Sequence, residues 1–389
     1  MAGARLIDPD LEFVRAVKSA GGETLKKCYQ CATCSTVCNL SPDDKPFPRK
    51  EMLMANWGQR KELMRDPDVW LCYQCNDCTT YCPRGARPGD VLAAIRAFTY
   101  RHFSFPSFMG KALSTRRALP ILILVPILIM VACIFLTAEK VNGQYLFMTA
   151  NEIDFNYFLP HSTVDALFVL GNIIIFIFAA VGFVRFWKML QTNGDKKSVS
   201  FVSAFISTLK EIFAHSRFRE CGANHARATG HMLLLFGFIG AMITTAVVLL
   251  FVFIPHYLEL LGAESIHSFF KVPIDFPHPV KILGALSGLA LTTGGALLIY
   301  RRLTNRDEVG ANGYADYLFL YVIFITGLSG LFSWWARMTG VAMLAYAIYF
   351  IHILGVYFLL WYMPYSKFAH MFYRSLAMVH ARTIGRIKG

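Results

Sequence analysis

Charged residues are scarce in this sequence. Only 16% of its 389 residues are Asp, Glu, Lys or Arg, against about 25% in an average soluble domain. Because 55% of the residues are apolar, the composition argues against a single soluble globule. It also excludes a disordered chain, a collagen-like chain and a small disulfide-stapled scaffold. At roughly 150 residues per domain, this length predicts two or three units.

The N-terminal stretch MAGARLIDPDLEF lacks the apolar core of a cleavable signal peptide. We therefore expect residues 1–115 to stay on the cytoplasmic side, where reducing conditions disfavour disulfide bonds. Eight of the ten cysteines fall between Cys28 and Cys82, whereas the long apolar runs begin only at Leu119. The sequence thus predicts a cysteine-rich head over residues 1–115 and a membrane domain over residues 116–389.

Long apolar runs fill the second part of the chain. A membrane-spanning helix needs about 20 apolar residues, and no soluble core would supply so many uniformly apolar stretches. We therefore predict an all-α membrane protein with a six-helix transmembrane bundle. The six predicted spans are Leu119–Leu136, Thr163–Trp187, Gly230–Ile254, Val280–Tyr300, Asp316–Trp335 and Val341–Met363.

Positive charge is distributed unevenly between the loops. If the N-terminus is inside, the inner loops and the C-terminal tail hold fifteen Lys and Arg residues, and the outer loops hold only Lys140, Lys271 and Arg337. Lys and Arg are retained on the cytoplasmic side, so this bias predicts an inner (cytoplasmic) membrane protein with both termini cytoplasmic. It also explains most of the net charge of +13 without nucleic acid as a partner.

The inner loop before the third span has apolar residues at helical spacing between Val202 and Phe213, with Lys210 and Arg217 nearby. This pattern predicts an amphipathic helix that lies on the membrane surface. Packing of the same helix against the head is the alternative.

Two cysteine runs share the pattern CxxCxxCxxxC. The first run is Cys28, Cys31, Cys34 and Cys38, and the second is Cys72, Cys75, Cys78 and Cys82. Three closely spaced thiolates can bind three corners of one [4Fe–4S] cluster, while the fourth cysteine ligates the other cluster in two-cluster ferredoxins. This predicts an α-helical, ferredoxin-like head with two [4Fe–4S] clusters. The predicted ligand sets are Cys28, Cys31, Cys34 and Cys82 for one cluster, and Cys72, Cys75, Cys78 and Cys38 for the other.

Zinc is the alternative metal, but zinc sites saturate at four ligands and typically pair two CxxC units, which two complete runs fit poorly. The first run departs from the ferredoxin pattern, because Asn39 stands where proline usually follows the last cysteine. Between the runs we expect a helix over Arg49–Arg65, and we expect Trp70 to pack over a cluster. Cys133, inside an apolar span, and Cys221, in an inner loop, are not convincing ligands.

Three of the eleven histidines lie where a haem could bind. His352 is inside the sixth span and His370 follows it by five helical turns, so a continuous helix would place both on one face, about 27 Å apart. That separation suits two stacked haems in a bilayer about 30 Å thick. His231 opens the third span at the depth of His370, and a haem between these two would tie their helices together. Ionisable residues inside a membrane mark functional sites by default, although each histidine could instead be a packing residue.

The segments around these histidines resemble the cytochrome b membrane subunit of respiratory nitrate reductases and the related E subunit of heterodisulfide reductases. The matching segments are GHMLLLFGFIGAMITT (Gly230–Thr245) and HILGVYFLLWYMPYSKFAH (His352–His370). In the nitrate reductase family each segment carries two haem-ligating histidines, and the resemblance therefore implies one or two haems b held by His231, His352 and His370. The fourth position is Ala241, which cannot ligate, so either one haem is lost or His352 uses another partner. The candidate partners are His161, His225, His256 and His278.

The head resembles the C subunit of heterodisulfide reductases in both cysteine runs and in the WxCxxC context of Trp70. A C-like head fused to an E-like membrane domain is the arrangement of the membrane-bound C subunit of the quinone-interacting membrane-bound oxidoreductase (Qmo) complexes of sulfate reducers. This resemblance implies an enzyme component that passes electrons between menaquinone and cytoplasmic flavin and iron–sulfur subunits, and indirectly to adenylylsulfate reductase. A heterodisulfide-reductase-type complex is the alternative.

Lys281 opens the fourth span near the expected depth of His352 and resembles the quinone-site lysine of the nitrate reductase cytochrome b. It could donate a hydrogen bond to a quinone carbonyl, or it could be an ordinary interfacial lysine. Two other function classes remain open. A transporter with a regulatory head would need paired charges or broken helices at mid-membrane, of which the spans show few. A plain anchor for iron–sulfur proteins would bind no haem.

Overall fold

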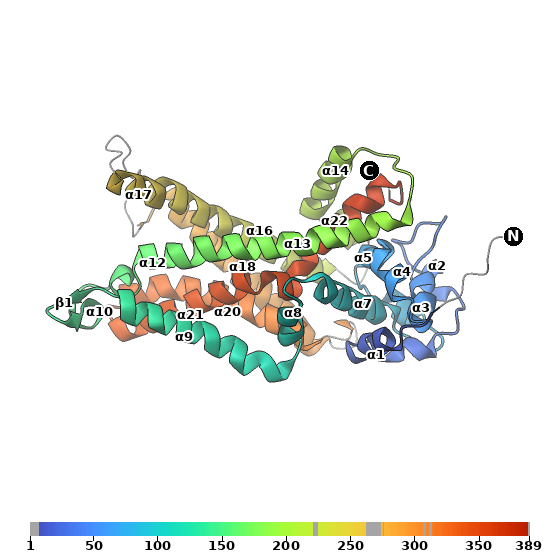
Figure 1. The fold of residues 1–389 in the computed structure, drawn as a ribbon, viewed down its shortest axis with the longest axis horizontal. Helices are drawn as coiled ribbons and strands as arrows, with labels where there is room; N and C mark the ends of the chain where they lie inside the picture. Colours follow the sequence, from blue (N-terminus) through green and yellow to red (C-terminus); the bar gives the residue numbers. More distant parts are fainter. Residues whose placement is uncertain are drawn as a thin grey trace.

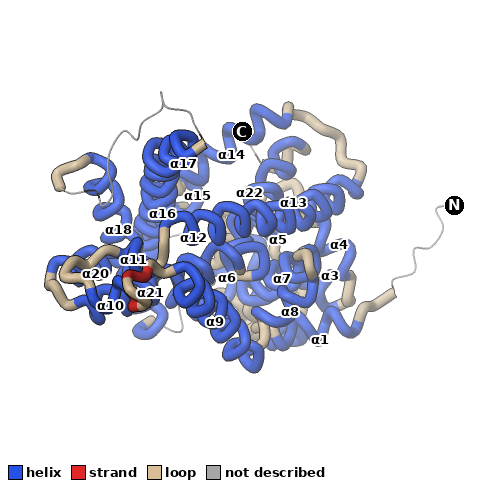
Figure 2. The backbone as a smooth tube through the Cα atoms, turned by 60° about the vertical axis from the view of Figure 1, so that its left-hand side comes forward, coloured by secondary structure: helices blue, strands red, loops and turns tan. Residues whose placement is uncertain are grey.

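The computed structural model describes residues 8–220, 225–261, 274, 276–305, 309–310 and 313–387. It shows a long helical bundle with a more compact head at one end (Figure 1). Helices account for most of the backbone, and the strands of the described part form one short hairpin (Figure 2). The prediction of a mostly helical protein with helices long and apolar enough to span a membrane is confirmed. The predicted boundary between the head and the membrane domain stays a prediction.

The head is built from short helices that precede one longer helix, α7. Its elements are α1 (Leu11–Ser19), the 3₁₀ helix η1 (Glu23–Lys27), α2 (Thr33–Thr36), α3 (Arg49–Asn56), α4 (Arg60–Arg65), α5 (Asp68–Leu71), α6 (Asp77–Thr80), α7 (Pro88–Phe103) and α8 (Ser107–Leu113).

Six helical stretches of the bundle are long and apolar enough to cross a membrane, in agreement with the six predicted spans. They are Arg116–Thr137, His161–Asn193, Arg227–Glu259, Pro279–Thr304, Tyr314–Met338 and Ala342–Trp361. Their elements are η2 (Arg116–Ala118) and α9 (Leu119–Thr137); α12 (His161–Asp165), the π-helix η3 (Ala166–Leu170), α13 (Gly171–Leu190) and η4 (Gln191–Asn193); α16 (His225–Val248), the π-helix η6 (Leu249–Phe253) and α17 (Ile254–Leu260); α18 (Pro279–Thr304); α20 (Tyr314–Met338); and α21 (Ala342–Trp361).

Shorter elements connect the spans. They are β1 (Lys140–Val141), β2 (Gln144–Tyr145), α10 (Leu146–Thr149), α11 (Phe155–Phe158), α14 (Phe201–Ala214), α15 (Ser216–Arg219), the 3₁₀ helices η7 (Met363–Tyr365) and η8 (Lys367–Ala369), and α22 (His370–Thr383). The hairpin pairs Lys140 with Tyr145 and Val141 with Gln144. Its turn is Asn142–Gly143, both at positive φ, which is the residue pair that a two-residue hairpin favours.

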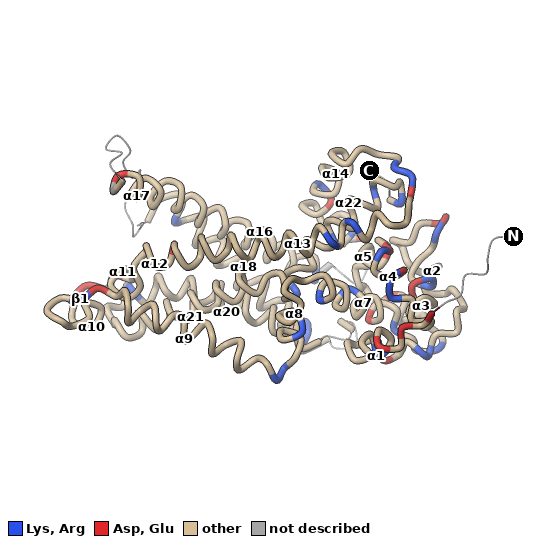
Figure 3. The backbone as a smooth tube through the Cα atoms, in the orientation of Figure 1, with Lys and Arg blue, Asp and Glu red and all other residues tan. Residues whose placement is uncertain are grey.

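Charged residues are concentrated at the head end of the molecule, and the middle of the bundle is nearly free of them (Figure 3). This distribution is what a bundle with an apolar mid-section requires, because a charge at the bilayer centre is costly. The prediction that the head end is cytoplasmic remains a prediction.

Small residues let neighbouring spans approach closely. A Cβ atom added at Gly237 of α16 would lie 2.9 Å from the Ser287 carbonyl of α18. One added at Gly294 of α18 would lie 2.8 Å from the Gly230 carbonyl of α16. Such contacts are typical of membrane helices, where dispersion at close range, rather than water exclusion, holds the helices together.

Two helix predictions need correction, and the first concerns the predicted helix Arg49–Arg65. It is interrupted between α3 and α4, because Gly58 adopts a φ of +66° and its carbonyl accepts a hydrogen bond from the Asp10 amide at 3.1 Å. A side chain there would lie 2.8 Å from the Asp10 nitrogen. The turn therefore brings the start of the head back onto α3.

The second correction concerns the continuous helix assumed between His352 and His370. The sixth span ends at Trp361, and η7 and η8 follow before α22 begins at His370. Pro364 has no amide hydrogen to continue the ladder, and the extended Ser366 caps the next turn by accepting a hydrogen bond from the Phe368 amide at 3.1 Å. The separation of 27 Å derived for a straight helix therefore does not apply.

The predicted amphipathic helix is α14. An ordinary packed helix buries its apolar side, whereas α14 buries a polar side. Its polar side is buried, since Arg382 of α22 pairs with Glu211 and donates a hydrogen bond to Thr208 at 2.9 Å. Its apolar residues point outward, with Val202 64% exposed. The packing alternative is therefore seen for the polar face of α14, which also contacts Tyr73 of the head. Its location on a membrane surface stays a prediction.

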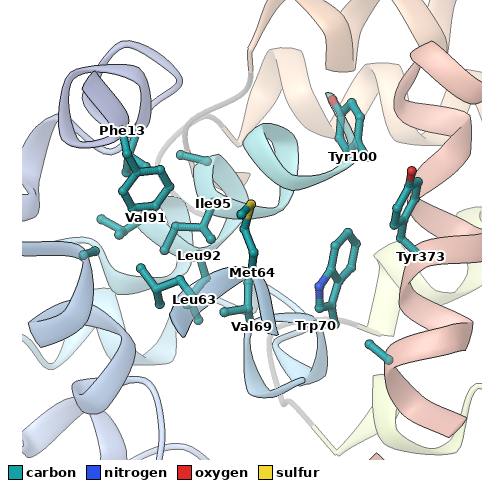
Figure 4. Close-up of a cluster of buried hydrophobic side chains, with 14 of the residues drawn as sticks. Phe13, Leu63, Met64, Val69, Trp70, Val91, Leu92, Ile95, Tyr100 and Tyr373 are labelled. Atoms are coloured by element: carbon teal, nitrogen blue, oxygen red, sulfur yellow. The ribbon is translucent and has the colours of Figure 1, made fainter. Parts of the chain in front are cut away.

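Trp70 lies at the junction between the head and the bundle, not only within the head. Its ring lies 5.5 Å from that of Phe186 on α13 and stacks at 5.9 Å on Tyr373 of α22. Figure 4 shows Trp70 between the apolar core of the head and Tyr373. Trp70 therefore joins the two parts, and Cys28, Cys72 and Cys82 border the same core. The expectation that it packs over a cluster stays a prediction.

Candidate functional site

The two cysteine loops have the same backbone conformation. In the first loop, Gln30 and Ala32 flank the second cysteine at φ values of 62° and 69°, and in the second, Gln74 and Asn76 do so at 53° and 71°. Positive φ is uncommon for residues other than glycine, so its occurrence at four equivalent positions is a specific feature. The left-handed residues curve each loop around a common centre.

The thiols form two groups, each of which draws on both loops. Burial, together with the nearby thiols of Cys28, Cys31 and Cys82, raises the pKa of Cys34 to about 11. Burial also raises the pKa of Cys38 to about 12, with a contribution from the nearby thiols of Cys72 and Cys75. These same two thiols, after burial, raise the pKa of Cys78. The last cysteine of each run therefore lies with the first three of the other run. We call Cys28, Cys31, Cys34 and Cys82 the outer thiol group, and Cys38, Cys72, Cys75 and Cys78 the inner thiol group.

Donors for cluster sulfur ligands are present in both loops. The Gln30 side-chain amide donates to the Cys28 sulfur at 3.2 Å, and the Gln74 backbone amide donates to the Cys72 sulfur at 3.3 Å. Four converging thiols with such donors fit a [4Fe–4S] cluster, whose reduction potential depends on hydrogen bonds to sulfur. In the outer thiol group, Cys31 is exposed and its neighbour Tyr29 is 68% exposed.

The inner thiol group faces the bundle. The Tyr73 hydroxyl donates to Glu211 of α14 at 3.1 Å, and Arg374 of α22 donates to the Cys72 carbonyl at 3.3 Å. The second cysteine loop therefore docks on the membrane domain, whereas the first reaches the surface of the head.

His231 and His370 come together at the head end of the bundle, although they lie on different helices. The His231 Nδ1 atom is 2.9 Å from His215 Nε2, and His370 is near enough to His231 for the two rings to interact electrostatically. The His370 Nδ1 atom is hydrogen-bonded to the Lys367 carbonyl. Burial first, and then the nearby Lys367 ammonium, lower the pKa of His370 to about 4, so the ring is neutral at physiological pH.

His352 lies deeper in the bundle. Its Nδ1 atom is 3.0 Å from the Thr326 carbonyl and 3.4 Å from the Ser329 hydroxyl, both on α20. Gly330 leaves room for the ring, since a Cβ atom there would lie 2.9 Å from His352 Cε1. In all three histidines Nδ1 forms a hydrogen bond, and among the residues that the structure describes no hydrogen bond involves their Nε2 atoms. This is the usual arrangement of metal-ligating histidine. The residues present therefore fit a haem iron.

The structure does not identify a partner for His352. His161 stands against Phe253 at 5.0 Å, and His256 against Tyr257 at 5.9 Å. His278 caps α18 by accepting a hydrogen bond from the Val280 amide. Within the described ranges, none of these three histidines shares a hydrogen bond or ring contact with His352. The side chain of His225 and the whole of Cys221 lie outside the described residues.

Three further positions behave as packing or edge residues. Ala241, at the site of the missing fourth histidine, packs against the apolar cluster that contains Leu234 and Leu291. Lys281 lies in the first turn of α18, with its Nζ atom 5.4 Å from the centre of the Trp334 ring. Trp334 is four residues, or about 6 Å along the helix, from Gly330 beside His352. Lys281 therefore lies about one helical turn from the depth of His352. Cys133 is partly buried against the apolar core of the bundle.

Sequence reasoning missed His215 and three arginines. His215 adopts a φ of 52° after α14, and nothing in its local pattern indicates that it meets His231. Arg96, Arg227 and Arg374 are 131 and 147 residues apart in the chain, in that order, and only the fold brings them to one loop. The WLCYQC segment indicated that this loop binds a cluster, but it did not indicate which residues of other helices contact the loop.

Comparison with known proteins assigns both parts of the chain. Residues 112–388 match the family model of citrate utilization protein B, and residues 24–86 match that of the 4Fe-4S dicluster domain. The chain is also similar to citrate utilization protein B of Escherichia coli, with 25% identity over 388 residues that cover 96% of this chain and 92% of that protein.

The head has closer relatives. It is 37% identical over 90 residues to the C subunit of the H(2):CoB-CoM heterodisulfide,ferredoxin reductase of Methanothermobacter marburgensis. It is 35% identical over 98 residues to a protein of Archaeoglobus profundus that is named for its likeness to the heterodisulfide reductase C subunit. These matches cover 22% and 25% of this chain, and the chain spans about half the length of both relatives (47% and 52%). No solved structure matches. The predicted resemblance of the head to the C subunit is confirmed, and so is its iron–sulfur character.

Proposed function

This chain belongs to the citrate utilization protein B family, and we propose that it is the membrane electron-transfer subunit of a multi-subunit oxidoreductase. It passes electrons between the quinone pool and cytoplasmic flavin and iron–sulfur subunits. The observation that carries the proposal is the order of three sites along one molecule. The outer thiol group lies at the surface of the head, the inner thiol group at the junction, and the His231–His370 pair at the head end of the bundle.

The two thiol groups are the proposed ligands of two [4Fe–4S] clusters. Each cluster supplies a one-electron carrier, and the chain supplies the position and the surroundings that tune it. The crossing of Cys38 and Cys82 between the loops supports this assignment, because one loop cannot present all four ligands to one cluster.

Haem b is the proposed carrier in the bundle, and His231 and His370 are the residues that would hold it. Haem supplies a further one-electron step within the apolar domain. Its support is that each ring has one nitrogen held by a protein acceptor or donor and the other left for iron. His352 is a proposed ligand of a second haem, and its own hydrogen bond to Thr326 would fix the ring.

Menaquinone is the proposed membrane substrate, and Lys281 is the proposed quinone-site residue. The ammonium group would donate a hydrogen bond to a quinone carbonyl at the end of the bundle far from the head. The substitution Lys281→Ala should slow quinol oxidation by the purified chain while its haem spectrum stays unchanged. Unchanged kinetics would remove Lys281 from the site.

The charge distribution supports a cytoplasmic head in the inner membrane, with both termini on that side. The soluble partners proposed from the sequence resemblance are the flavin and iron–sulfur subunits of a Qmo-type complex. These would connect the chain to adenylylsulfate reductase in sulfate respiration. The relatives of the head support the alternative of a heterodisulfide-reductase-type complex.

A second candidate for the soluble partner follows from the match that covers 96% of this chain. That relative is named for citrate utilization, which suggests a partner that oxidises or reduces a small organic acid. The membrane steps are the same in all three cases. Co-purification of the full-length chain with its native cytoplasmic partner, followed by identification of the substrate of that partner, separates them.

Counts of iron, acid-labile sulfide and pyridine haem on the purified chain test the proposal. We expect roughly eight non-haem iron and eight sulfide, with one or two haems. A haem count of zero would leave an iron–sulfur anchor, and zinc in place of iron would exclude electron transfer by the head. Substitution of His161, His225, His256 and His278 in turn, with the haem count as readout, identifies any partner of His352.

A further inference from the structure

Three arginines from three different helices converge on the loop that carries the inner thiol group. Arg96 lies on α7, Arg227 on α16 and Arg374 on α22, and we call them the arginine triad. They are widely separated in the sequence and meet only because the head docks on one end of the bundle. All three are partly buried.

Each member of the triad acts on the loop. Arg96 donates a hydrogen bond to the Val69 carbonyl at 2.7 Å, three residues before Cys72, and interacts electrostatically with the Cys72 side chain. The Arg374 guanidinium donates to the Cys72 carbonyl at 3.3 Å and lies 3.7 Å from the centre of the Tyr73 ring. The loop is therefore held from two sides at its first cysteine.

Arg227 completes the contacts from the membrane side. One of its nitrogens donates to the carbonyls of Tyr73 and Gln74, at 2.8 Å and 3.0 Å. Among the described residues, no carboxylate forms an ion pair with any member of the triad. The nearby Asp316 pairs with Lys367, and Glu211 pairs with Arg382. Three positive charges thus surround this loop without an acidic partner from the described part of the protein.

The first cysteine loop, which belongs to the outer thiol group, also has arginines beside it, but these lie at the surface. Arg84 lies 4.1 Å from the centre of the Tyr29 ring, as Arg374 lies over Tyr73. Arg49 donates to the Gln30 carbonyl at 3.1 Å. Both arginines are exposed, so water and salt screen their charges. The two thiol groups therefore share a loop conformation and differ in their electrostatic surroundings.

A cluster bound by four thiolates is an anion, and its negative charge increases by one on reduction. Positive charge held nearby in a poorly solvated position stabilises the reduced form most and raises the reduction potential. Burial by itself would act in the opposite direction, because it disfavours the more highly charged form. Three guanidinium groups at hydrogen-bonding distance of the loop oppose this effect.

We propose that the arginine triad raises the reduction potential of the inner cluster above that of the outer cluster, so that an electron entering at the head surface is drawn toward the bundle. The electron that leaves the outer cluster is the one that the inner cluster gains. This inference rests on the proposed function, and it adds to it the order of the two cluster potentials.

The test is a redox titration of the full-length chain in detergent, with the two clusters followed by electron paramagnetic resonance. Arg374→Gln should lower the midpoint potential of one cluster, and Arg374→Lys, which keeps the charge, should lower it less. Arg227→Gln provides a second, independent variant in case Arg374→Gln does not fold. Arg84→Gln is the matched control and should shift neither cluster appreciably.

The affected cluster is identified by removing one cluster at a time. The shift caused by Arg374→Gln should persist in a Cys82→Ser background, which keeps the inner cluster, and should vanish in a Cys38→Ser background. The inference is overturned if the wild-type inner cluster has the lower potential, or if Arg374→Gln and Arg227→Gln move both clusters equally or neither. If the purified chain contains no iron and no sulfide, the proposed function itself fails, which distinguishes the two failures.

Discussion

At the scale of single residues, the fourth cysteine of each run determines which cluster a substitution removes. Cys82 follows the second loop in sequence but lies with the thiols of the first. Cys82→Ser should therefore remove the outer cluster and about half of the iron and sulfide.

Double substitutions sharpen this prediction. Cys28→Ser combined with Cys82→Ser should retain one cluster, because both residues serve the same site. Cys72→Ser combined with Cys82→Ser should lose both clusters. Equal iron contents for the two double variants, measured on protein of equal purity, would contradict the crossed ligand sets.

A second residue-scale prediction concerns the buried carboxyl of Glu51. Burial raises its pKa well above the usual range, and the neighbouring Asp66 adds to the effect, while Lys50 opposes it at 3.2 Å. The unfolded chain releases this proton near pH 4.3, whereas the folded chain keeps it to higher pH. Since the folded state then binds more protons, stability contributed by Glu51 falls as pH rises above about 4.3 toward its folded pKa.

Glu51→Gln should remove this pH dependence. Relative to the parent protein, its thermal unfolding temperature should therefore rise more at pH 8 than at pH 5. The measurement is thermal unfolding of the full chain in detergent at the two pH values. Glu12→Gln, on the exposed side of α1, is the control and should change neither value. A Glu51→Gln variant with the same pH dependence as the parent protein would assign the proton to another group.

At the scale of elements, the C-terminal segment after α22 is fastened to the head by one buried ion pair. Arg386 donates two hydrogen bonds to Asp68, at 2.8 Å and 2.7 Å, and the side chains are only 5% and 2% exposed. Removing one partner of a buried pair costs up to about 3–5 kcal/mol when the remaining charge is uncompensated. Here Lys50 also pairs with Asp68 at 3.0 Å and offsets part of that cost. Arg386→Gln should therefore destabilise the docking of α22 on the head.

Limited proteolysis of the C-terminal segment measures this effect. Cleavage should be faster in Arg386→Gln than in the parent protein. Asp44→Asn is the matched control, because Asp44 pairs with the same guanidinium at 3.2 Å but is 70% exposed, and exposed pairs contribute about 0–1 kcal/mol. Equal rates of cleavage in the two variants would show that the Arg386–Asp68 ion pair does not hold the C-terminal segment on the head.

The elements also show what sequence patterns could and could not predict. The six spans follow from uninterrupted apolar runs, and these are a property of the chain itself. The break between α21 and α22 depends on Pro364 and on the cap at Ser366. The spacing argument assumed a continuous straight helix and took neither residue into account. The outward apolar face of α14 depends on where Arg382 lies, and that is a tertiary fact.

For the site, local spacing was sufficient where the ligands come from loops of fixed length. The cysteine runs indicated two clusters and the crossing of Cys38 and Cys82, and the observed grouping of thiols supports that assignment. The histidine depths indicated the meeting of His231 and His370. His215 and the arginine triad could not be found from spacing, because residues from separate helices reach one loop only after the head has docked.

At the scale of the whole molecule, the three proposed sites form one route for electrons between the surface of the head and the membrane. The sites follow the order of the chain: the outer thiol group belongs to the N-terminal head and His370 to the last helix. The route therefore exists only if the head remains docked through Trp70, Tyr373 and Arg386.

The most direct measurement of this route uses the full-length chain in proteoliposomes that contain long-chain menaquinone, which stays in the bilayer. The protein is first reduced with dithionite without oxygen, excess reductant is removed, and the haem spectrum and cluster signals are followed as the quinone reoxidises them. The account predicts that haem and both clusters are oxidised in the parent protein, and that His370→Ala, with its clusters intact, leaves the clusters reduced. Cluster oxidation at the same rate in His370→Ala would contradict the route through the bundle.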